Sequence, residues 1–261
     1  MKFAGSLGLD QNGDEILSAL RDHGVSTDQV RRAPDVATGS AIILVDAEGE
    51  NSIIIDSGAN ARMVIDEHCQ GVLQGVGVLL VQLEIPIEAV VNIVRIARES
   101  GILTVVNAAP VPVTRPQDLR NLLAHTDILV VNEIEAAQIL QSTGLPFSTP
   151  PTEDEIAAVT TLGPRSVVTT LGACGVLVVG PEGSTRRVNG IRIAARDTTG
   201  AGDAFCAGMV ASLVREDDLD GAVAWGNACG AYAALSEGAQ DSFGRREQVK
   251  VFAESARRGA S

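Results

Sequence analysis

The chain has 261 residues, of which 45% are hydrophobic, and a formal net charge of −13. This length and hydrophobic share suit one large α/β domain with a filled core, whereas the excess of acidic residues argues against nucleic acid or an anionic membrane as a partner. No apolar run approaches the roughly 20 residues that cross a bilayer, and residues 1–10 lack a basic region followed by an apolar one, so we expect a cytoplasmic protein.

Strand-length apolar runs alternate with helix-length amphipathic segments after a first pair of runs that predicts a hairpin. That hairpin comprises residues 40–45 and 52–56, which are separated only by Asp46-Ala-Glu-Gly-Glu-Asn51. We then predict a strand at 76–82, a helix at 87–100, a strand at 103–107, a helix at 117–124, a strand at 128–131, a helix at 133–141, strands at 166–171 and 175–179, two short strands within 185–195, and helices at 201–215, 219–235 and 246–257. The alternation predicts a doubly wound α/β fold, with a mainly parallel sheet flanked by helices.

The run Asp197-Thr-Thr-Gly-Ala-Gly-Asp203 stands at the start of a predicted helix. Gly200, Ala201 and Gly202 have little or no side chain, so a phosphate can approach their unpaired amides, and the helix dipole favours an anion there. Asp203 follows directly, where a carboxylate can accept the proton of an attacking hydroxyl. The run therefore predicts phosphoryl transfer, with a plain tight turn capped by Asp203 as the alternative.

Polar residues also follow the predicted strands, at the edge where open parallel sheets bind ligands. They are Glu84, Asn107, Asn132 and the turn Thr170-Leu-Gly172. Each one alone could be a turn or cap residue. Together they predict the rim of a cleft.

Several strings of residues along the chain match one family in order. They are Ala47-Glu-Gly-Glu-Asn-Ser52, Ser57-Gly-Ala-Asn-Ala61, Val81-Gln-Leu-Glu84, Asn107-Ala-Ala-Pro110, Val131-Asn-Glu-Ile-Glu-Ala136, Thr170-Leu-Gly172 with Gly175, Asp197-Thr-Thr-Gly-Ala-Gly-Asp-Ala-Phe-Cys-Ala-Gly208 and Glu237-Gly-Ala-Gln240. In this order they resemble the ribokinase-like (PfkB) carbohydrate kinases, and the resemblance covers essentially the whole chain.

The resemblance implies an ATP-dependent carbohydrate kinase, most similar to members that phosphorylate O5 of D-ribose to ribose 5-phosphate. Asp203 would be the catalytic base, and Gly200, Ala201 and Gly202 would stabilise the transferred phosphoryl group. Two alternatives remain open. One is a family kinase for another sugar or nucleoside, and the other is a nucleotide-binding protein that has lost its sugar site and does no catalysis.

The resemblance also implies a role for individual residues. For ATP these residues are Asn132, Thr170, Gly172, Gly175, Gly202 and Asn227; for the sugar they are Glu84, Asp203, Gly58 and Asn60. Glu135 would hold Mg²⁺ through water, because a carboxylate plus waters is the usual way in which Mg²⁺ is bound. An activating K⁺ would be held by Asp197, Thr199, Ala233, Ser236, Gly238 and Ser242. For Asp197 and Ser242, plain capping is the alternative.

The chain departs from the family at its start. The family begins with a strand that carries an Asn-x-Asp sugar contact, followed by lid strands and a Gly-Gly-Lys-Gly-Ala-Asn motif, and nothing of that kind precedes residues 1–8. We therefore expect a single ribokinase-like domain, residues 1–261, that is N-terminally incomplete, with residues 40–56 forming part of a lid. That hairpin would have an unpaired edge, and we expect a homodimer only if the lid is complete.

Overall fold

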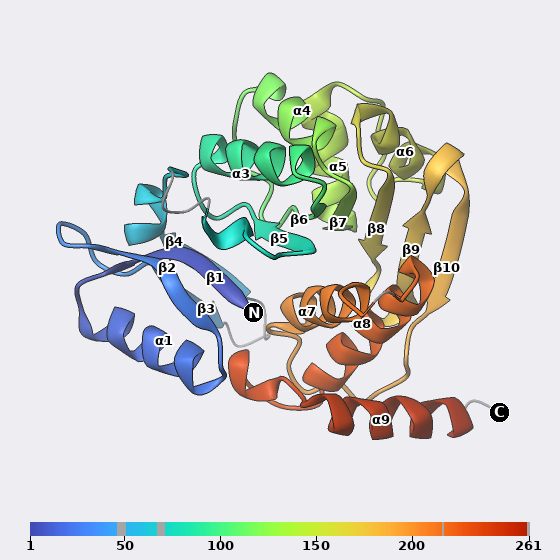
Figure 1. Ribbon diagram of the computed structural model, residues 1–261. Coiled ribbons are helices and arrows are strands. Elements are labelled where there is room, and N and C mark those ends of the chain that lie inside the picture. The colour runs from blue at the N-terminus through green and yellow to red at the C-terminus, as the bar shows by residue number, and fades with distance from the viewer. Residues whose placement is uncertain (46–50, 67–70, 216, 260–261) are drawn as a thin grey trace.

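In the part of the chain that the structure describes, the main sheet has six strands in the order β10-β9-β8-β7-β6-β5. The computed structural model describes residues 1–45, 51–66, 71–215 and 217–259 (Figure 1). The strands are β5 (Val78–Gln82), β6 (Leu103–Asn107), β7 (Ile128–Asn132), β8 (Ser166–Thr170), β9 (Gly175–Val179) and β10 (Thr185–Asn189). Strands β5 to β8 are parallel, whereas β9 and β10 are each antiparallel to the preceding strand. The predicted α/β fold with a mainly parallel sheet is confirmed.

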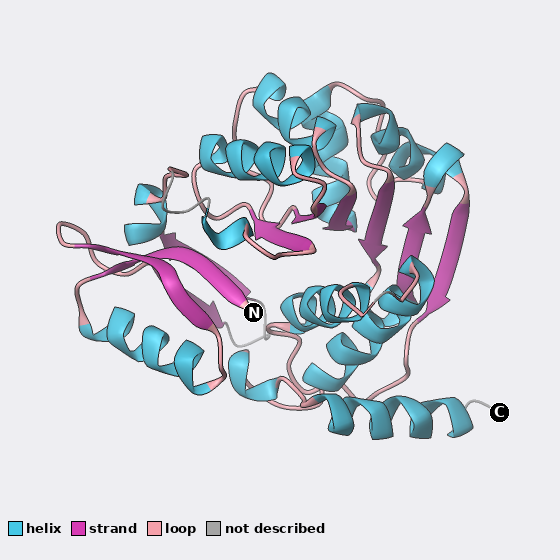
Figure 2. Ribbon diagram, viewed as in Figure 1, coloured by secondary structure: helices cyan, strands magenta, loops and turns pink. Residues whose placement is uncertain are grey.

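Helices cover both faces of this sheet (Figures 1 and 2). One face carries α3 (Ile87–Glu99), α4 (Pro116–Ala124) and α5 (Glu133–Thr143), and the other carries α7 (Ala201–Leu213) and α8 (Leu219–Ala233). The short α6 (Glu153–Ala158) follows α5, and α9 (Arg246–Gly259) packs against α8. No helix in the described ranges has the length and apolar character that crossing a membrane requires.

Two hydrophobic cores follow from the period-2 alternation of the strands. Val106 and Leu129 belong to the core beneath α3, α4 and α5, whereas their neighbours Val105 and Val130 belong to the core beneath α7 and α8. The strands are therefore apolar on both faces, which is why they appear in the sequence as continuous hydrophobic runs. Because the strands are buried on both faces, the positions of their ends are fixed, and so is the edge of the sheet on which the polar residues at those ends lie.

The N-terminal part forms two small sheets beside the β5 end of the main sheet (Figure 1). β1 (Lys2–Gly8) and β2 (Ser26–Ala33) are parallel and are connected by α1 (Gln11–Asp22). β3 (Ser40–Val45) and β4 (Asn51–Asp56) form an antiparallel hairpin in which Ile42 pairs with Ile54, so the predicted hairpin is confirmed. Within the described residues β3 and β4 pair only with each other. Residues 46–50, which hold most of the Ala47–Ser52 string, lie outside the described residues.

The structure corrects one predicted segment. Of the two short strands predicted within 185–195, only β10 at Thr185–Asn189 is present. A Cβ on Gly190 would lie 2.0 Å from the carbonyl oxygen of Ala173, so the backbone crosses the β8–β9 turn at this point. The chain then leaves the sheet and runs toward α7.

Candidate active site

The C-terminal ends of the parallel strands bring polar side chains to one edge. In the register of the sheet, Gln82 at the end of β5 pairs with Asn107 at the end of β6, and Asn132 at the end of β7 pairs with Thr170 at the end of β8. Parallel strands end on the same side of a sheet, and ligands of open α/β folds bind beyond that side. The rim residues predicted from the sequence thus lie along a single edge.

The first turn of α7 has no side-chain cap. Gly200 is its N-cap residue, with a left-handed φ of 74°. The helices α5 and α8, in contrast, are capped by the side chains of Asn132 and Asp218. A Cβ on Gly200 would lie 3.1 Å from Cε1 of Phe243 and 3.2 Å from Cα of Ala239, so this turn packs tightly against the segment after α8. The start of α7 is therefore an uncapped helix N-terminus, which favours an anion.

Asp203 lies in this first turn and faces the end of β5. Its Oδ1 accepts a hydrogen bond of 3.0 Å from Nε2 of Gln82. Burial raises the pKa of the Asp203 carboxyl, and the hydrogen bond from Gln82 opposes part of that rise. Burial also raises the pKa of Glu84, and the charge of Asp203 raises it further. Two carboxylates therefore share the space between the end of β5 and the start of α7.

Asn132 and Glu135 form a reciprocal cap at the start of α5. The backbone N–H of Glu135 donates to Oδ1 of Asn132, and the backbone N–H of Asn132 donates to Oε2 of Glu135, both at 2.8 Å. Burial raises the pKa of Glu135, whereas the hydrogen bond from Asn132 lowers it. The cap holds the Glu135 carboxylate in one orientation at the edge of the sheet.

The charges of Glu135 and Asp203 both act on the buried thiol of Cys206. Burial raises the pKa of Cys206 to about 12, and the charges of Asp203 and then Glu135 add to the rise. Both carboxylates therefore lie within electrostatic reach of one side chain on α7. Asn132 ends β7 and caps α5, and Gln82 ends the parallel strand β5 and contacts Asp203, so the starts of α5 and α7 lie at the same end of the sheet.

The turn between β8 and β9 is fixed by two glycines. Gly172, with a φ of 54°, begins a short 3-10 helix, η4 (Gly172–Cys174). A Cβ on Gly175 would lie 2.0 Å from the carbonyl oxygen of Val188, so β10 passes directly against this turn. Gly175 pairs with Asn189 in the sheet, and Nδ2 of Asn227 donates to the carbonyl oxygen of Asn189 at 2.9 Å. The structure thus brings Asn227 of α8 next to the turn of Gly172 and Gly175.

The residues predicted to bind K⁺ lie in two segments that meet beside Gly200. Oδ1 and Oδ2 of Asp197 accept hydrogen bonds of 2.9 Å from the backbone N–H groups of Thr199 and Gly238, respectively. The hydrogen bonds from the Thr199 side chain and from these two backbone groups hold the pKa of Asp197 below its usual range. Ser242 is buried, and its Oγ donates to the carbonyl oxygen of Ala239 at 2.6 Å.

The remaining members of this set, Ala233 and Ser236, lie at and just after the end of α8. The backbone N–H of Ser236 donates to the carbonyl oxygen of Ala233 at 3.3 Å. The side chains and carbonyls of the set offer oxygen atoms only, from one carboxylate, three hydroxyls and the backbone carbonyls, which is the chemistry that hard cations prefer. The described residues hold no group of three or more His, Cys, Asp or Glu side chains that could bind a metal, so a cation here would depend on backbone oxygens.

Gly58 and Asn60 lie in the N-terminal part, in the 3-10 helix η1 (Gly58–Arg62), which packs against β1 and β2. Gly58 has a φ of 45°, and a Cβ on it would lie 2.5 Å from the carbonyl oxygen of Ala37. A Cβ on Gly39 would lie 3.1 Å from Nδ2 of Asn60. Both residues therefore belong to a tightly packed crossing next to the β3–β4 hairpin and not to the row of strand ends.

Comparison with known proteins identifies the family. The model of the pfkB family of carbohydrate kinases matches residues 1–245. The chain belongs to this family. It is 34% identical over 263 residues to a ribokinase of Haemophilus influenzae, which covers 97% of this chain and 81% of that protein. It is 30% identical over 253 residues to a deoxyribokinase of Salmonella typhi, which covers 94% and 79% of the two chains.

A solved structure shows the same fold. The ribokinase of Arabidopsis thaliana complexed with ribose and ATP matches with a TM-score of 0.85 and 27% identity, over 97% of this chain and 81% of that one. Kinases of the pfkB family are phosphotransferases that use ATP and an alcohol acceptor. This pfkB kinase therefore has the enzyme class expected from its Asp197–Asp203 run.

One residue beside Asp203 is not among those predicted from the sequence. The string Val81-Gln-Leu-Glu84 predicts Glu84 as a site residue, yet Gln82 is the residue that hydrogen-bonds to Asp203. Its signal is its position, because Gln82 is the last residue of β5 and the only polar one in that strand. The rule that selected Asn107 and Asn132, a polar residue at the end of a predicted parallel strand, would have selected Gln82 as well.

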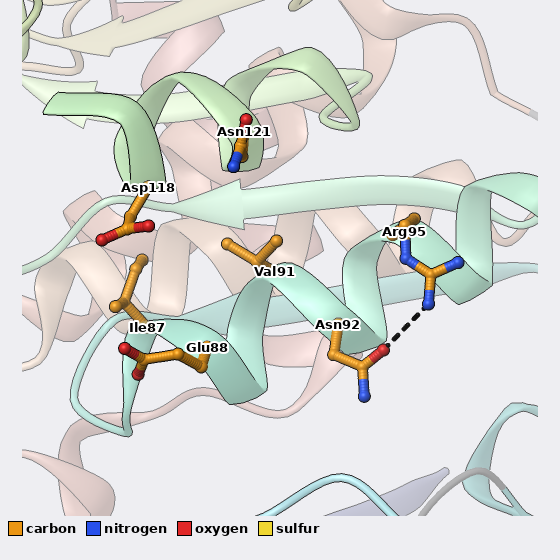
Figure 3. Close-up of a pocket in the computed structure, with 7 residues that line it drawn as sticks. All are labelled: Ile87, Glu88, Val91, Asn92, Arg95, Asp118 and Asn121. Carbon is orange, nitrogen blue, oxygen red and sulfur yellow. Dashed lines mark hydrogen bonds between the residues drawn. The ribbon is translucent and has the colours of Figure 1, made fainter. Parts of the chain in front are cut away.

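A separate pocket of about 270 Å³ lies between α3 and α4 (Figure 3). It is lined by Ile87, Glu88, Val91, Asn92, Arg95, Asp118 and Asn121. Arg95 forms an ion pair with Glu99, and Asp118 forms one with Arg115. The pocket contains none of the predicted site residues of the kinase.

Proposed function

We propose that this kinase transfers the γ-phosphoryl group of ATP to O5 of D-ribose, giving ribose 5-phosphate and ADP. The observation that carries the proposal is the placement of Asp203 at the uncapped start of α7 and next to Glu84. Three parts of a kinase site would then lie at one end of the sheet. They are the start of α7 to bind an anion, Asp203 as the base, and Glu84 to bind sugar hydroxyls. The similarity to ribokinases supports ribose as the sugar, and we place the reaction in the cytoplasm, where ATP is available.

In the proposed reaction, O5 of the sugar attacks the γ-phosphorus in line with the leaving oxygen. Asp203 accepts the O5 proton as the new O–P bond forms, the bond between the γ-phosphorus and the bridging oxygen breaks, and ADP leaves. The amides of Gly200, Ala201 and Gly202 stabilise the charge that develops on the phosphoryl oxygens. Glu84 accepts hydrogen bonds from the sugar, with Gly58 and Asn60 on the side of the N-terminal part.

We propose that the nucleotide lies along the row of strand ends, from the start of α7 to the turn between β8 and β9. The residues in this proposal are Asn132, Thr170, Gly172, Gly175, Gly202 and Asn227. Glu135 would hold Mg²⁺ through water, and its fixed orientation in the α5 cap fits that task. Bound Mg²⁺ would neutralise phosphate charge.

We also propose that K⁺ binds among Asp197, Thr199, Ala233, Ser236, Gly238 and Ser242. These residues surround the segment against which Gly200 packs, so a cation there would stabilise the shape of the anion-binding turn without contacting the sugar. The oxygen-only chemistry of the set supports a hard monovalent cation. Activation by K⁺ is the measurable consequence.

We propose that the β3–β4 hairpin forms part of a lid over the sugar. Ile42, Leu44 and Ile54 of this hairpin are 59%, 52% and 57% exposed. Large apolar side chains gathered on one small sheet favour burial against another surface. We propose that a second copy of the chain covers this face when the lid sheet is complete, which would give a homodimer.

Identification of the product tests the proposed substrate. The protein is incubated with Mg-ATP and K⁺ together with D-ribose, 2-deoxy-D-ribose or a nucleoside, and the phosphorylated position is assigned by ³¹P and ¹³C NMR. Phosphate on O5 of ribose, formed faster than any other product, would support the proposal. Preferred phosphorylation of deoxyribose or of a nucleoside would favour the second candidate, a family kinase with another acceptor. The similarity to a deoxyribokinase is the reason for including deoxyribose.

A further inference from the structure

Gln82 connects two elements that are far apart in the sequence. Its Nε2 lies 3.0 Å from Oδ1 of Asp203, across a separation of 121 positions. The backbone of Gln82 is fixed by its pairing with Asn107, because all five residues of β5 are in register with β6. The amide of Gln82 therefore projects from a rigid strand end onto the first turn of α7.

The surroundings of Asp203 explain why such a donor matters. Among the described residues, the charge of Asp203 acts on Glu84, from the segment after β5, and on the buried thiol of Cys206, from the next turn of α7. Glu135 acts on the same thiol from the start of α5. These groups are all acidic, so none of them supplies a positive charge that would stabilise the ionised form of Asp203. The amide N–H of Gln82 stabilises the ionised form of Asp203 by a hydrogen bond, and it adds no charge that would attract the phosphates.

We propose that Gln82 is the positioning residue of Asp203, which holds Oδ1 in a hydrogen bond so that Oδ2 is directed to the sugar hydroxyl. The proposal rests on the proposed function for the identity of the base. A carboxylate with one oxygen fixed loses rotational freedom before the substrate arrives, which is the preorganisation that proton transfer needs. Gln82 itself touches neither the sugar nor the phosphate in this account.

The test compares Gln82→Met, which keeps the length of the side chain and removes the donor, with Gln82→Glu, which replaces the donor by a like charge. The control is Gln141→Met on the exposed surface of α5. The first readout is independent of activity. It is the pKa of the Asp203 carboxyl, measured by NMR on protein labelled with ¹³C at the aspartate carboxyl and assigned with Asp203→Asn.

In Gln82→Met we expect the pKa of Asp203 to rise by about one pH unit, since a hydrogen bond to the charged form is lost. Gln82→Glu should raise it further, and Gln141→Met should leave it unchanged. In the kinetic readout, the acid limb of kcat/KM should move to higher pH in Gln82→Met. Its kcat at neutral pH should fall about 10-fold through lost orientation, with an unchanged KM for ATP.

The outcomes separate the two proposals. An unchanged Asp203 pKa and an unchanged acid limb in Gln82→Met, with thermal unfolding like that of the wild type, would overturn the role of Gln82. A wild-type protein that phosphorylates no sugar would contradict the proposed function instead, while the NMR titration would still decide the contact between Gln82 and Asp203. A folded Gln82→Met variant in which the pKa rises supports the inference in either case.

Discussion

Asp197 and Gly238, which lie 41 positions apart, are joined by a hydrogen bond of 2.9 Å from the backbone N–H of Gly238 to Oδ2 of Asp197. The other carboxylate oxygen accepts the backbone N–H of Thr199. One side chain therefore connects the loop before α7 with the loop after α8. Gly200, the N-cap of α7, packs against the second of these loops at Ala239 and Phe243. We therefore expect the shape of the first turn of α7 to depend on this connection.

Asp197→Asn should weaken activation by K⁺. The substitution removes the only carboxylate of the proposed cation set and keeps its size, so the K⁺ concentration for half-activation should rise by about 10-fold or more, consistent with loss of a charge-assisted ligand. The measurement is kcat as a function of KCl at constant ionic strength. Equal K⁺ dependence of the wild type and the variant would contradict a cation site at Asp197.

The same substitution should change the pH dependence of stability. The hydrogen bonds from Thr199 and Gly238 hold the pKa of Asp197 below its unfolded value, so its contribution is present above the unfolded pKa, about 3.9, and is lost as the pH falls through the folded pKa. The stability difference between the wild type and Asp197→Asn should therefore shrink below about pH 4. Urea unfolding at pH 7 and pH 3 measures it, and a difference that grows on acidification would argue against this account.

Asp203→Asn should leave ATP binding nearly intact while lowering turnover at least about 10²-fold, the loss expected when a general base is removed. A matched control is Asp154→Asn, which changes an exposed aspartate in the first turn of α6. Isothermal titration with a non-hydrolysable ATP analogue measures binding, and a coupled assay measures turnover. Unchanged turnover in Asp203→Asn would remove Asp203 from the mechanism.

Gly226→Val should separate α7 from α8 and impair both stability and activity. A Cβ on Gly226 would lie 2.8 Å from the carbonyl oxygen of Phe205, which cannot move without displacing α7. We expect a loss of about 1–3 kcal/mol in unfolding free energy, as for overpacking elsewhere, together with lower kcat because Asp203 lies on the displaced helix. The control is Gly77→Ala, where no heavy atom beyond Gly77 and its two chain neighbours lies within 4 Å of the added Cβ. A fully active Gly226→Val variant would show that α7 tolerates displacement.

Asp127→Ala should destabilise the fold without altering the site. Asp127 is 6% exposed, its Oδ2 accepts hydrogen bonds from both the backbone N–H and the hydroxyl of Thr104, and Arg98 lies 3.3 Å from its Oδ1. Removing a buried carboxylate and leaving the backbone N–H of Thr104 without its acceptor should cost about 3 kcal/mol. Asp220→Asn, in an exposed ion pair with Arg186, should cost less than about 1 kcal/mol. Urea unfolding compares the two, and similar losses would contradict the assigned role of Asp127.

The sequence was most informative where burial alone decides the structure. Strands β6 and β9 and the first residues of α3 and α7 were predicted at their observed positions, because apolar runs and the turns between them are local signals. β2 was not predicted. Its sequence, Ser26–Ala33, is polar and charged, and it is a strand because it pairs with β1. Pairing with a remote partner leaves no periodic pattern in one sequence.

In the site, too, features with a local signal in the sequence could be predicted, whereas contacts between remote segments could not. Asp203, Asn132 and Thr170 could be selected from their motifs or from their place at strand ends. The structure pairs Asn132 with Thr170 at that edge and joins Asp203 to it through Gln82 at the end of β5. The hydrogen bond between Gln82 and Asp203 could not be predicted, since it depends on how β5 and α7 lie in space. The proposed roles of Gly58 and Asn60 in sugar binding remain predictions, because both residues lie in the N-terminal part, at the crossing of η1 with Gly39.

The most direct test of the central claim is ADP release by the purified chain with Mg-ATP and K⁺, in the presence and absence of D-ribose. We expect D-ribose to stimulate turnover and Asp203→Asn to lower the stimulated rate at least about 10²-fold. Binding of ATP with no stimulation by ribose, deoxyribose or a nucleoside would contradict this expectation, and would favour a protein that binds the nucleotide without transferring its phosphoryl group to a sugar.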